Sequence, residues 1–119
     1  MVFKSKNFCI VLSSPSGAGK TSISKMLLKK DKLLSLSISC TTRPIRIGEV
    51  NKKDYIFLNQ EQFNDSVKKN KFLESAYVFG YKYGTLKDTI NDFFNKKKDV
   101  LFDIDWQGYQ QLKQSNMDV

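Results

Sequence analysis

The sequence predicts an α/β fold with a parallel sheet, and three observations support this. The apolar run "FCIVLSS" has the continuous hydrophobicity of a strand buried on both faces. A glycine-rich turn follows, and apolar residues then recur at helical spacing from Lys20 to about Asp31. Later in the chain, "DVLFDID" (99–105) is a second apolar run that predicts a core strand. Strands that alternate with helices in this way typically build a parallel sheet.

The segments between these runs predict the remaining elements. The run "LLSLSISC" (33–40) predicts a single strand. From Gly48 to about Tyr83 the elements become short, as in a small inserted subdomain: a strand "DYIFL", a helix capped by Asn59, and a strand "FLESAYV". A returning helix then has one wide apolar face, made of Leu86, Ile90, Phe93 and Phe94. Another amphipathic helix begins near Trp106.

Composition indicates an ordinary globular domain that favours anionic partners. The chain has 119 residues and a formal net charge of +8, which favours nucleotides, nucleic acid or acidic membrane surfaces without choosing among them. The lysine clusters follow apolar periodic segments, so we interpret them as solvated helix ends rather than a nucleic-acid surface. Histidine is absent, and Cys9 and Cys40 lie in apolar runs, which predicts buried thiols of a reducing compartment. No segment has the length of a membrane span, so we expect a cytoplasmic protein.

The stretch "SSPSGAGKTS" (13–22) joins the first predicted strand to the first predicted helix. It matches the phosphate-binding pattern G-x-x-x-x-G-K-[ST], except that Ser14 replaces the first glycine. Gly17 and Gly19 let backbone N–H groups surround phosphate oxygens. Lys20 can reach the outer phosphates, and the Thr21 hydroxyl can bind Mg²⁺. A plain glycine and serine turn would not explain lysine followed by threonine at this place.

These features predict the three-layer core of the P-loop NTPases, with a parallel sheet and an inserted small subdomain. The residues expected to bind ATP are Ser14, Pro15, Ser16, Gly17, Ala18, Gly19, Lys20 and Thr21. We expect the first strand, loop and helix in residues 1–36, the subdomain in 37–85, and the return to the core in 86–119.

Only two arginines occur among the twenty lysine and arginine residues, and both lie in "SISCTTRPIRIGEV" (37–50). A guanidinium presents a rigid planar fork that binds phosphate or carboxylate with two hydrogen bonds, whereas lysine is a flexible point charge. Arg43 and Arg46 therefore predict an oxyanion site. The alternative, that they cap a strand or pair with surface acids, stays open for the residues alone.

Two aspartates close the predicted core strand at 99–105. Ligands of open α/β sheets bind at the carboxyl ends of the strands. Because side chains alternate along a strand, Asp103 and Asp105 point to the same face. A carboxylate that ends an apolar strand is what a Mg²⁺ site of the Walker B type requires, although the pattern is weak by itself. We expect Thr21 and Asp103 to hold the metal.

The order and spacing of these motifs resemble those of the guanylate kinase family, which phosphorylates GMP or dGMP from ATP. The segments that carry the resemblance are "PSGAGKTS", "SISCTTRPIRIGEVNKKDYIFL", "FLESAYVFGYKYGT" and "VLFDIDWQG". The resemblance implies that the 37–85 subdomain binds GMP, with its phosphate on Arg43 and Arg46 and the hydroxyls of Tyr55 and Tyr83 beside them. By the same resemblance Lys20, Arg43 and Arg46 are catalytic.

The resemblance also implies a guanine site. Guanine offers an N1–H and an amino group as donors, so its edge matches carboxylates. Glu74 and Asp105 would accept these hydrogen bonds, while Ser39 and Thr85 would contact O6 or N7. Plain structural roles remain the alternative, with Glu74 as a solvated strand residue and Tyr55 and Tyr83 as core aromatics.

Family members extend beyond the segment matched here, into a mobile lid with further arginines and a last core strand. We therefore expect an N-terminal part of such an enzyme, weakly active or inactive alone, with ATP and GMP or dGMP as partners, Mg²⁺ as cofactor, and no nucleic acid or membrane partner. Two alternatives remain. A related P-loop kinase for another small phosphate acceptor should lack Glu74 and Asp105, and a non-catalytic module that binds phosphopeptides has usually lost the phosphate loop.

Overall fold

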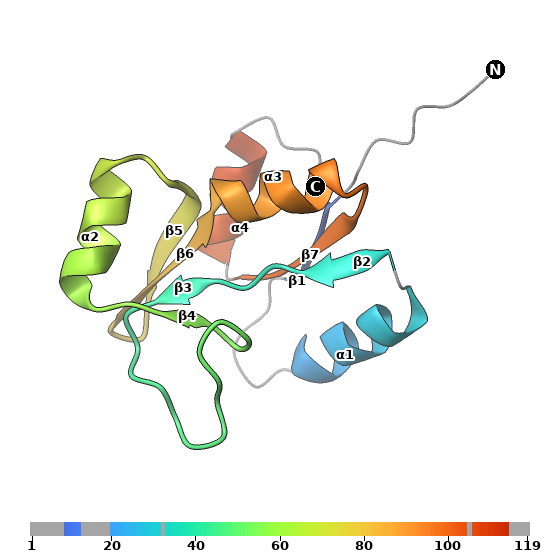
Figure 1. Ribbon diagram of the computed structural model, residues 1–119, viewed down its shortest axis with the longest axis horizontal. Coiled ribbons are helices and arrows are strands. Elements are labelled where there is room, and N and C mark those ends of the chain that lie inside the picture. The colour runs from blue at the N-terminus through green and yellow to red at the C-terminus, as the bar shows by residue number, and fades with distance from the viewer. Residues whose placement is uncertain (1–8, 13–19, 32, 105, 115–119) are drawn as a thin grey trace.

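A computed structural model describes residues 9–12, 20–31, 33–104 and 106–114, and of residues 20–24 and 106 only the helical backbone. Two sheets organise the chain (Figure 1). The first has the strand order β1-β7-β2, with β1 at Cys9–Leu12, β7 at Asp99–Asp103 and β2 at Leu34–Leu36. Both pairings in it are parallel, as predicted. The α/β fold with a parallel sheet is therefore confirmed.

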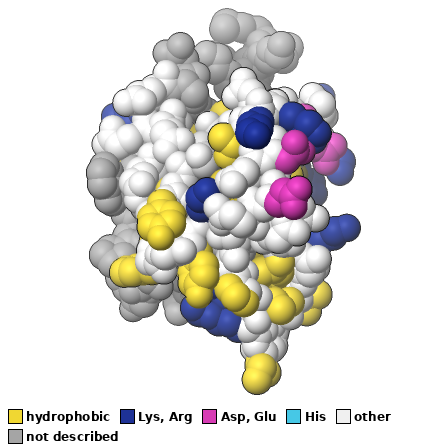
Figure 2. All heavy atoms as spheres, turned by 90° about the vertical axis from the view of Figure 1, so that its left-hand side faces the viewer, with side chains coloured by type: hydrophobic (Ala, Val, Ile, Leu, Met, Phe, Trp, Pro, Cys, Tyr) yellow, Lys and Arg dark blue, Asp and Glu magenta, His cyan; other side chains and the backbone are white. Residues whose placement is uncertain are grey.

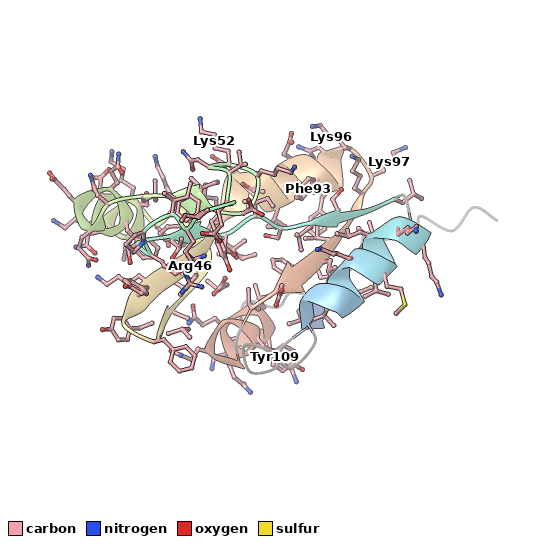
Figure 3. All side chains as sticks on the ribbon, turned by 90° about the horizontal axis from the view of Figure 1, so that it is seen from below. Arg46, Lys52, Phe93, Lys96, Lys97 and Tyr109 are labelled. Carbon is pink, nitrogen blue, oxygen red and sulfur yellow. The ribbon has the colours of Figure 1, made fainter. Side chains whose placement is uncertain are left out.

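Two helices cover this parallel sheet. Helix α1 (Lys20–Lys30) packs against β2 and β7, and helix α3 (Lys87–Asn95) packs against β7 and β6. The two helices lie on opposite sides of the sheet (Figures 1 and 3). One buried cluster joins β1 and β7 to α3 and, through Leu112, to helix α4 (Trp106–Gln114); its members are Cys9, Ile90, Val100, Phe102, Ile104 and Leu112. Burial on both faces explains why β1 and β7 are continuous apolar runs.

The second sheet has the strand order β4-β3-β6-β5. Its strands are β3 (Cys40–Thr41), β4 (Ile56–Phe57), β5 (Phe72–Val78) and β6 (Tyr81–Leu86). Helix α2 (Gln60–Lys68) covers it through Phe63, which packs with Cys40 and Phe72. Helix α4 (Trp106–Gln114) packs against β5. Among the described residues, no helix has the length and apolar character needed to cross a lipid bilayer.

Several predicted elements are correct. The strand 72–78 has the predicted bounds. Asn59 caps α2, and its side chain accepts from the Gln62 backbone N–H at 2.7 Å while the Gln62 side chain accepts from the Asn59 backbone at 2.9 Å. Cys9 and Cys40 are buried free cysteines, as predicted. Lys96 and Lys97 follow the last residue of α3 at the exposed end of that helix (Figure 3), in agreement with a solvated lysine cluster.

Four predictions of bounds are wrong. The strand predicted at "DYIFL" (54–58) is present only as β4, Ile56–Phe57. The single strand expected at 33–40 is divided, because β2 pairs with β7 while β3 pairs with β4 and β6 of the other sheet. The core strand predicted at 99–105 ends at Asp103. Leu86 ends β6 instead of opening the apolar face of α3. The division of the chain into a first core part (1–36), an inserted subdomain (37–85) and a return to the core (86–119) stays a prediction.

Candidate nucleotide monophosphate site

The loop that follows β3 carries both arginines. Thr41, which ends β3 and is fully buried, accepts a hydrogen bond from the Arg43 backbone N–H at 3.1 Å and donates to the Lys82 carbonyl at 3.0 Å. This anchors the start of the loop to β6. The Arg43 side chain is turned inward, with 7% exposed, while Arg46 lies exposed on the same loop (Figure 3). The loop therefore carries one buried guanidinium, that of Arg43, and one exposed to solvent, that of Arg46.

Arg43 makes a bidentate ion pair with Glu49. Its two terminal nitrogens donate to the two carboxylate oxygens of Glu49 at 2.9 and 2.7 Å. The Arg46 backbone N–H donates to the same carboxylate at 2.8 Å. These bonds lower the pKa of Glu49 to about 2, with the Arg43 side chain as the largest cause and the Arg46 backbone second. Glu49 hence stays ionised and holds the guanidinium in one orientation.

Glu49 is a site residue that the sequence pattern did not single out. The sequence allowed surface acids as partners of the arginines, and in the structure Glu49 is the partner of Arg43. The signal was available, because Glu49 stands three residues after Arg46 in the same loop, and a carboxylate is the natural partner of an arginine fork.

Two tyrosines lie beside Arg43. The Arg43 guanidinium carbon is 5.1 Å from the centre of the Tyr55 ring, and the rings of Tyr55 and Tyr83 are 6.0 Å apart. The pKa of Tyr55 is raised, mainly by burial and next by Tyr83, while Arg43 opposes the shift and Asp103 adds to it. The pKa of Arg43 is raised above its ordinary range, chiefly by its hydrogen bonds to Glu49 and further by Tyr83. The Tyr55 phenol therefore stays a neutral hydrogen-bonding group next to a permanent cation, which suits an anionic ligand.

Exposed apolar side chains surround this loop. Figure 2 shows hydrophobic side chains gathered toward the lower part of the face it draws, and the loop after β3 contributes the exposed residues Ile45, Ile47 and Val50. The arginine site thus lies on a loop that buries Arg43 but leaves its own apolar side chains exposed.

Glu74 and Thr85 form a second buried group. They face each other across β5 and β6, and the Thr85 hydroxyl donates to a carboxylate oxygen of Glu74 at 2.6 Å. Glu74 is 4% exposed and Thr85 is fully buried, so the alternative of a solvated Glu74 is wrong. A bulge between Phe72 and Glu74 shifts the register by one residue and so brings Glu74 opposite Thr85.

Strand β6 connects the two groups. Tyr83 and Thr85 are two residues apart on this strand, so their side chains point to the same face. The Cα atoms of Tyr83 and Thr85 are therefore about 7 Å apart, and β6 joins the arginine and tyrosine cluster to the pair of Thr85 and Glu74. Ser39, half-buried, precedes β3, and its carbonyl accepts from the Ile56 backbone at 2.9 Å.

The predicted ATP and metal residues are only partly described. The loop residues 14–19 and Asp105 lie outside the described residues, and Lys20 and Thr21 are placed only as the first backbone positions of α1. Asp103 ends β7 and is the register partner of Leu12 on β1. Because Leu12 immediately precedes the stretch 13–22, Asp103 lies beside the strand that leads into the predicted phosphate loop.

Comparison with known proteins identifies the family. The family model described as guanylate kinase matches residues 6–119. The guanylate kinase of Rickettsia felis is 49% identical over 119 residues, which is 100% of this chain and 62% of that protein. The guanylate kinase of Paramagnetospirillum magneticum is 49% identical over 110 residues, which is 92% of this chain and 51% of that protein.

A solved structure agrees with this match. The crystal structure of guanylate kinase from Anaplasma phagocytophilum has a TM-score of 0.79 and 36% identity, over 94% of this chain and 55% of that one. The chain thus spans about half to three-fifths of the length of the relatives compared here. On the family match and these relatives, the chain belongs to the guanylate kinase family.

Proposed function

We propose that this chain supplies the GMP-binding part of an enzyme that transfers a phosphoryl group from ATP to GMP or dGMP. The observation that carries the proposal is the buried carboxylate of Glu74, held by Thr85 next to the cluster of Arg43, Tyr55 and Tyr83. A guanine ring needs an acceptor for its N1–H and amino group, and a monophosphate needs cations and hydroxyl donors. Residues of both kinds occur here in two groups that β6 joins through Tyr83 and Thr85.

The phosphate of GMP would bind on the side of Arg43 that faces the two tyrosines, because Glu49 already occupies the fork formed by the two terminal nitrogens. Arg46 is exposed and can turn toward the same phosphate. Together they would neutralise the acceptor phosphate and hold it in line with the donor, which is how such enzymes accelerate transfer. Lys20 and the stretch 14–21 would bind the ATP phosphates.

The residues proposed for Mg²⁺ fit that ion. Thr21 offers a hydroxyl and Asp103 a carboxylate, and Mg²⁺ prefers oxygen ligands. Asp103 also ends the strand beside the one that leads into the phosphate loop, where ligands of such sheets bind. When bound, Mg²⁺ would supply charge neutralisation at the transferring phosphoryl group.

The test is ADP formation from ATP and Mg²⁺ by the protein expressed from its complete reading frame, with GMP or AMP as the acceptor. We expect GMP-dependent ADP formation that exceeds the AMP-dependent rate by a factor of about ten or more, since AMP leaves the carboxylate without a matching donor. Equal rates with the two acceptors, or a rate independent of any acceptor, would contradict the proposal.

A further inference from the structure

Glycine 108, on helix α4, stands directly against the carboxylate of Glu74. A Cβ built at Gly108 would lie 2.6 Å from the Glu74 Oε2 atom and 3.1 Å from its carboxyl carbon. Real Cβ atoms essentially never come within 3.0 Å of another group, so any larger residue would force a movement. Glycine is otherwise unfavourable inside a helix, by about 1 kcal/mol relative to alanine. The lack of space for a Cβ atom beside the Glu74 carboxylate explains why glycine occurs at this position.

Helix α4 cannot withdraw to make room without breaking other contacts. The Gln111 side chain accepts from the Ser75 backbone N–H at 2.8 Å and donates to the Ser75 carbonyl at 2.5 Å. The Gln107 side chain donates to the Tyr77 carbonyl at 3.1 Å. These bonds fix the separation between α4 and the edge of β5 on both sides of Gly108.

The carboxylate cannot easily move either. Its other oxygen accepts the hydrogen bond from Thr85, and the whole residue is 4% exposed. Glu74 thus occupies a space bounded by β6 on one side and by the backbone of α4 on the other.

We infer that Gly108 is a positioning residue for guanine recognition, and that its missing side chain sets where the Glu74 carboxylate lies. The inference rests on the proposed function, because it assumes that Glu74 contacts the base. Residue 108 then controls the preference for GMP over AMP without contacting the nucleotide itself.

The test is calorimetric titration of the Gly108→Ala variant with GMP and with AMP. We expect the GMP affinity to fall about tenfold or more while the AMP affinity changes much less, because only guanine uses the displaced carboxylate. In a Glu74→Gln background the same substitution should change the preference little, since the two residues act through one contact. The control is Gln110→Ala, an exposed position on α4, which should leave both affinities unchanged.

The outcomes separate this inference from the proposed function. If the unmodified chain shows no preference for GMP, the proposed function fails. If it prefers GMP, and Glu74→Gln removes the preference while a folded Gly108→Ala retains it, this inference alone is overturned. If Gly108→Ala does not fold, the shorter carboxylate of a Gly108→Ala, Glu74→Asp double variant should restore folding. Failure to restore it would show that the overlap with Glu74 is not the cause.

Discussion

Substitution of Thr85 by valine tests the buried pair that organises the proposed base site. Valine has nearly the shape of threonine but lacks the hydroxyl that donates to Glu74 at 2.6 Å. Both residues are buried, so water cannot easily replace the lost bond. A hydrogen bond to a charged group contributes about 1.5 to 3 kcal/mol, and we expect the free energy of unfolding to fall by that amount.

Urea denaturation followed by circular dichroism measures this change. At an m value of about 1.5 kcal/mol/M, the loss corresponds to a midpoint lowered by about 1 to 2 M. The matched control is Thr85→Ser, which keeps the hydroxyl and loses one methyl group, so that it should be destabilised less, by about 1 kcal/mol. A valine variant as stable as the parent chain would refute the view that Thr85 holds Glu74 through this bond.

Three further predictions concern the arginine loop and the thiols. Because the pKa of Glu49 in the folded chain is about 2, below its ordinary value of 4.5, the Glu49 contribution to stability is present above pH 4.5 and is lost as the pH falls toward 2. Glu49→Gln should therefore flatten the fall of the urea midpoint between pH 5 and 2, and an unchanged slope would contradict the assignment. Arg43→Lys should weaken GMP binding more than ATP binding in calorimetry, because the charge remains but the paired hydrogen bonds to Glu49 that hold it beside the two tyrosines are lost; an equal loss would contradict the placement of Arg43 at the acceptor phosphate. Burial raises the pKa of Cys40 to about 11, so iodoacetamide at pH 8 should leave this thiol unmodified in the native chain and modify it in urea, as mass spectrometry can show.

The elements with strong local signals could be predicted from the sequence. The apolar runs of β1 and β7 and the cap at Asn59 depend on neighbouring residues, and all three elements are present, with β7 ending at Asp103. Strand β6 was not predicted, because "YKYGTL" is polar and contains a glycine. It is stabilised instead by pairing with β5 on one side and β3 on the other. The division of 33–40 between two sheets was not predicted either. It depends on pairing with β7 in one sheet and with β4 and β6 in the other, and these strands are distant in sequence.

For the candidate site, the residues could be predicted from the sequence, but their contacts could not. The scarcity of arginine led to Arg43, and family resemblance led to Tyr55, Glu74, Tyr83 and Thr85. The structure places them in two groups, one of Arg43 with the two tyrosines and one of Glu74 with Thr85. Their contacts could not be predicted, because they depend on three-dimensional register. The bulge that places Glu74 opposite Thr85 has no clear sequence signal, and the closeness of Gly108 to Glu74 depends on how α4 meets β5.

The central claim is that the buried Glu74 carboxylate gives this chain a guanine nucleotide site, and the ratio of GMP to AMP affinity tests it most directly. Calorimetric titration of the parent chain and of Glu74→Gln supplies both ratios under one set of conditions. We expect the parent to bind GMP at least about tenfold more tightly than AMP, and the ratio to fall by about tenfold or more in the variant, since an acceptor matched to guanine is lost. A parent chain that does not bind GMP, or a ratio that the substitution leaves unchanged, would contradict this claim.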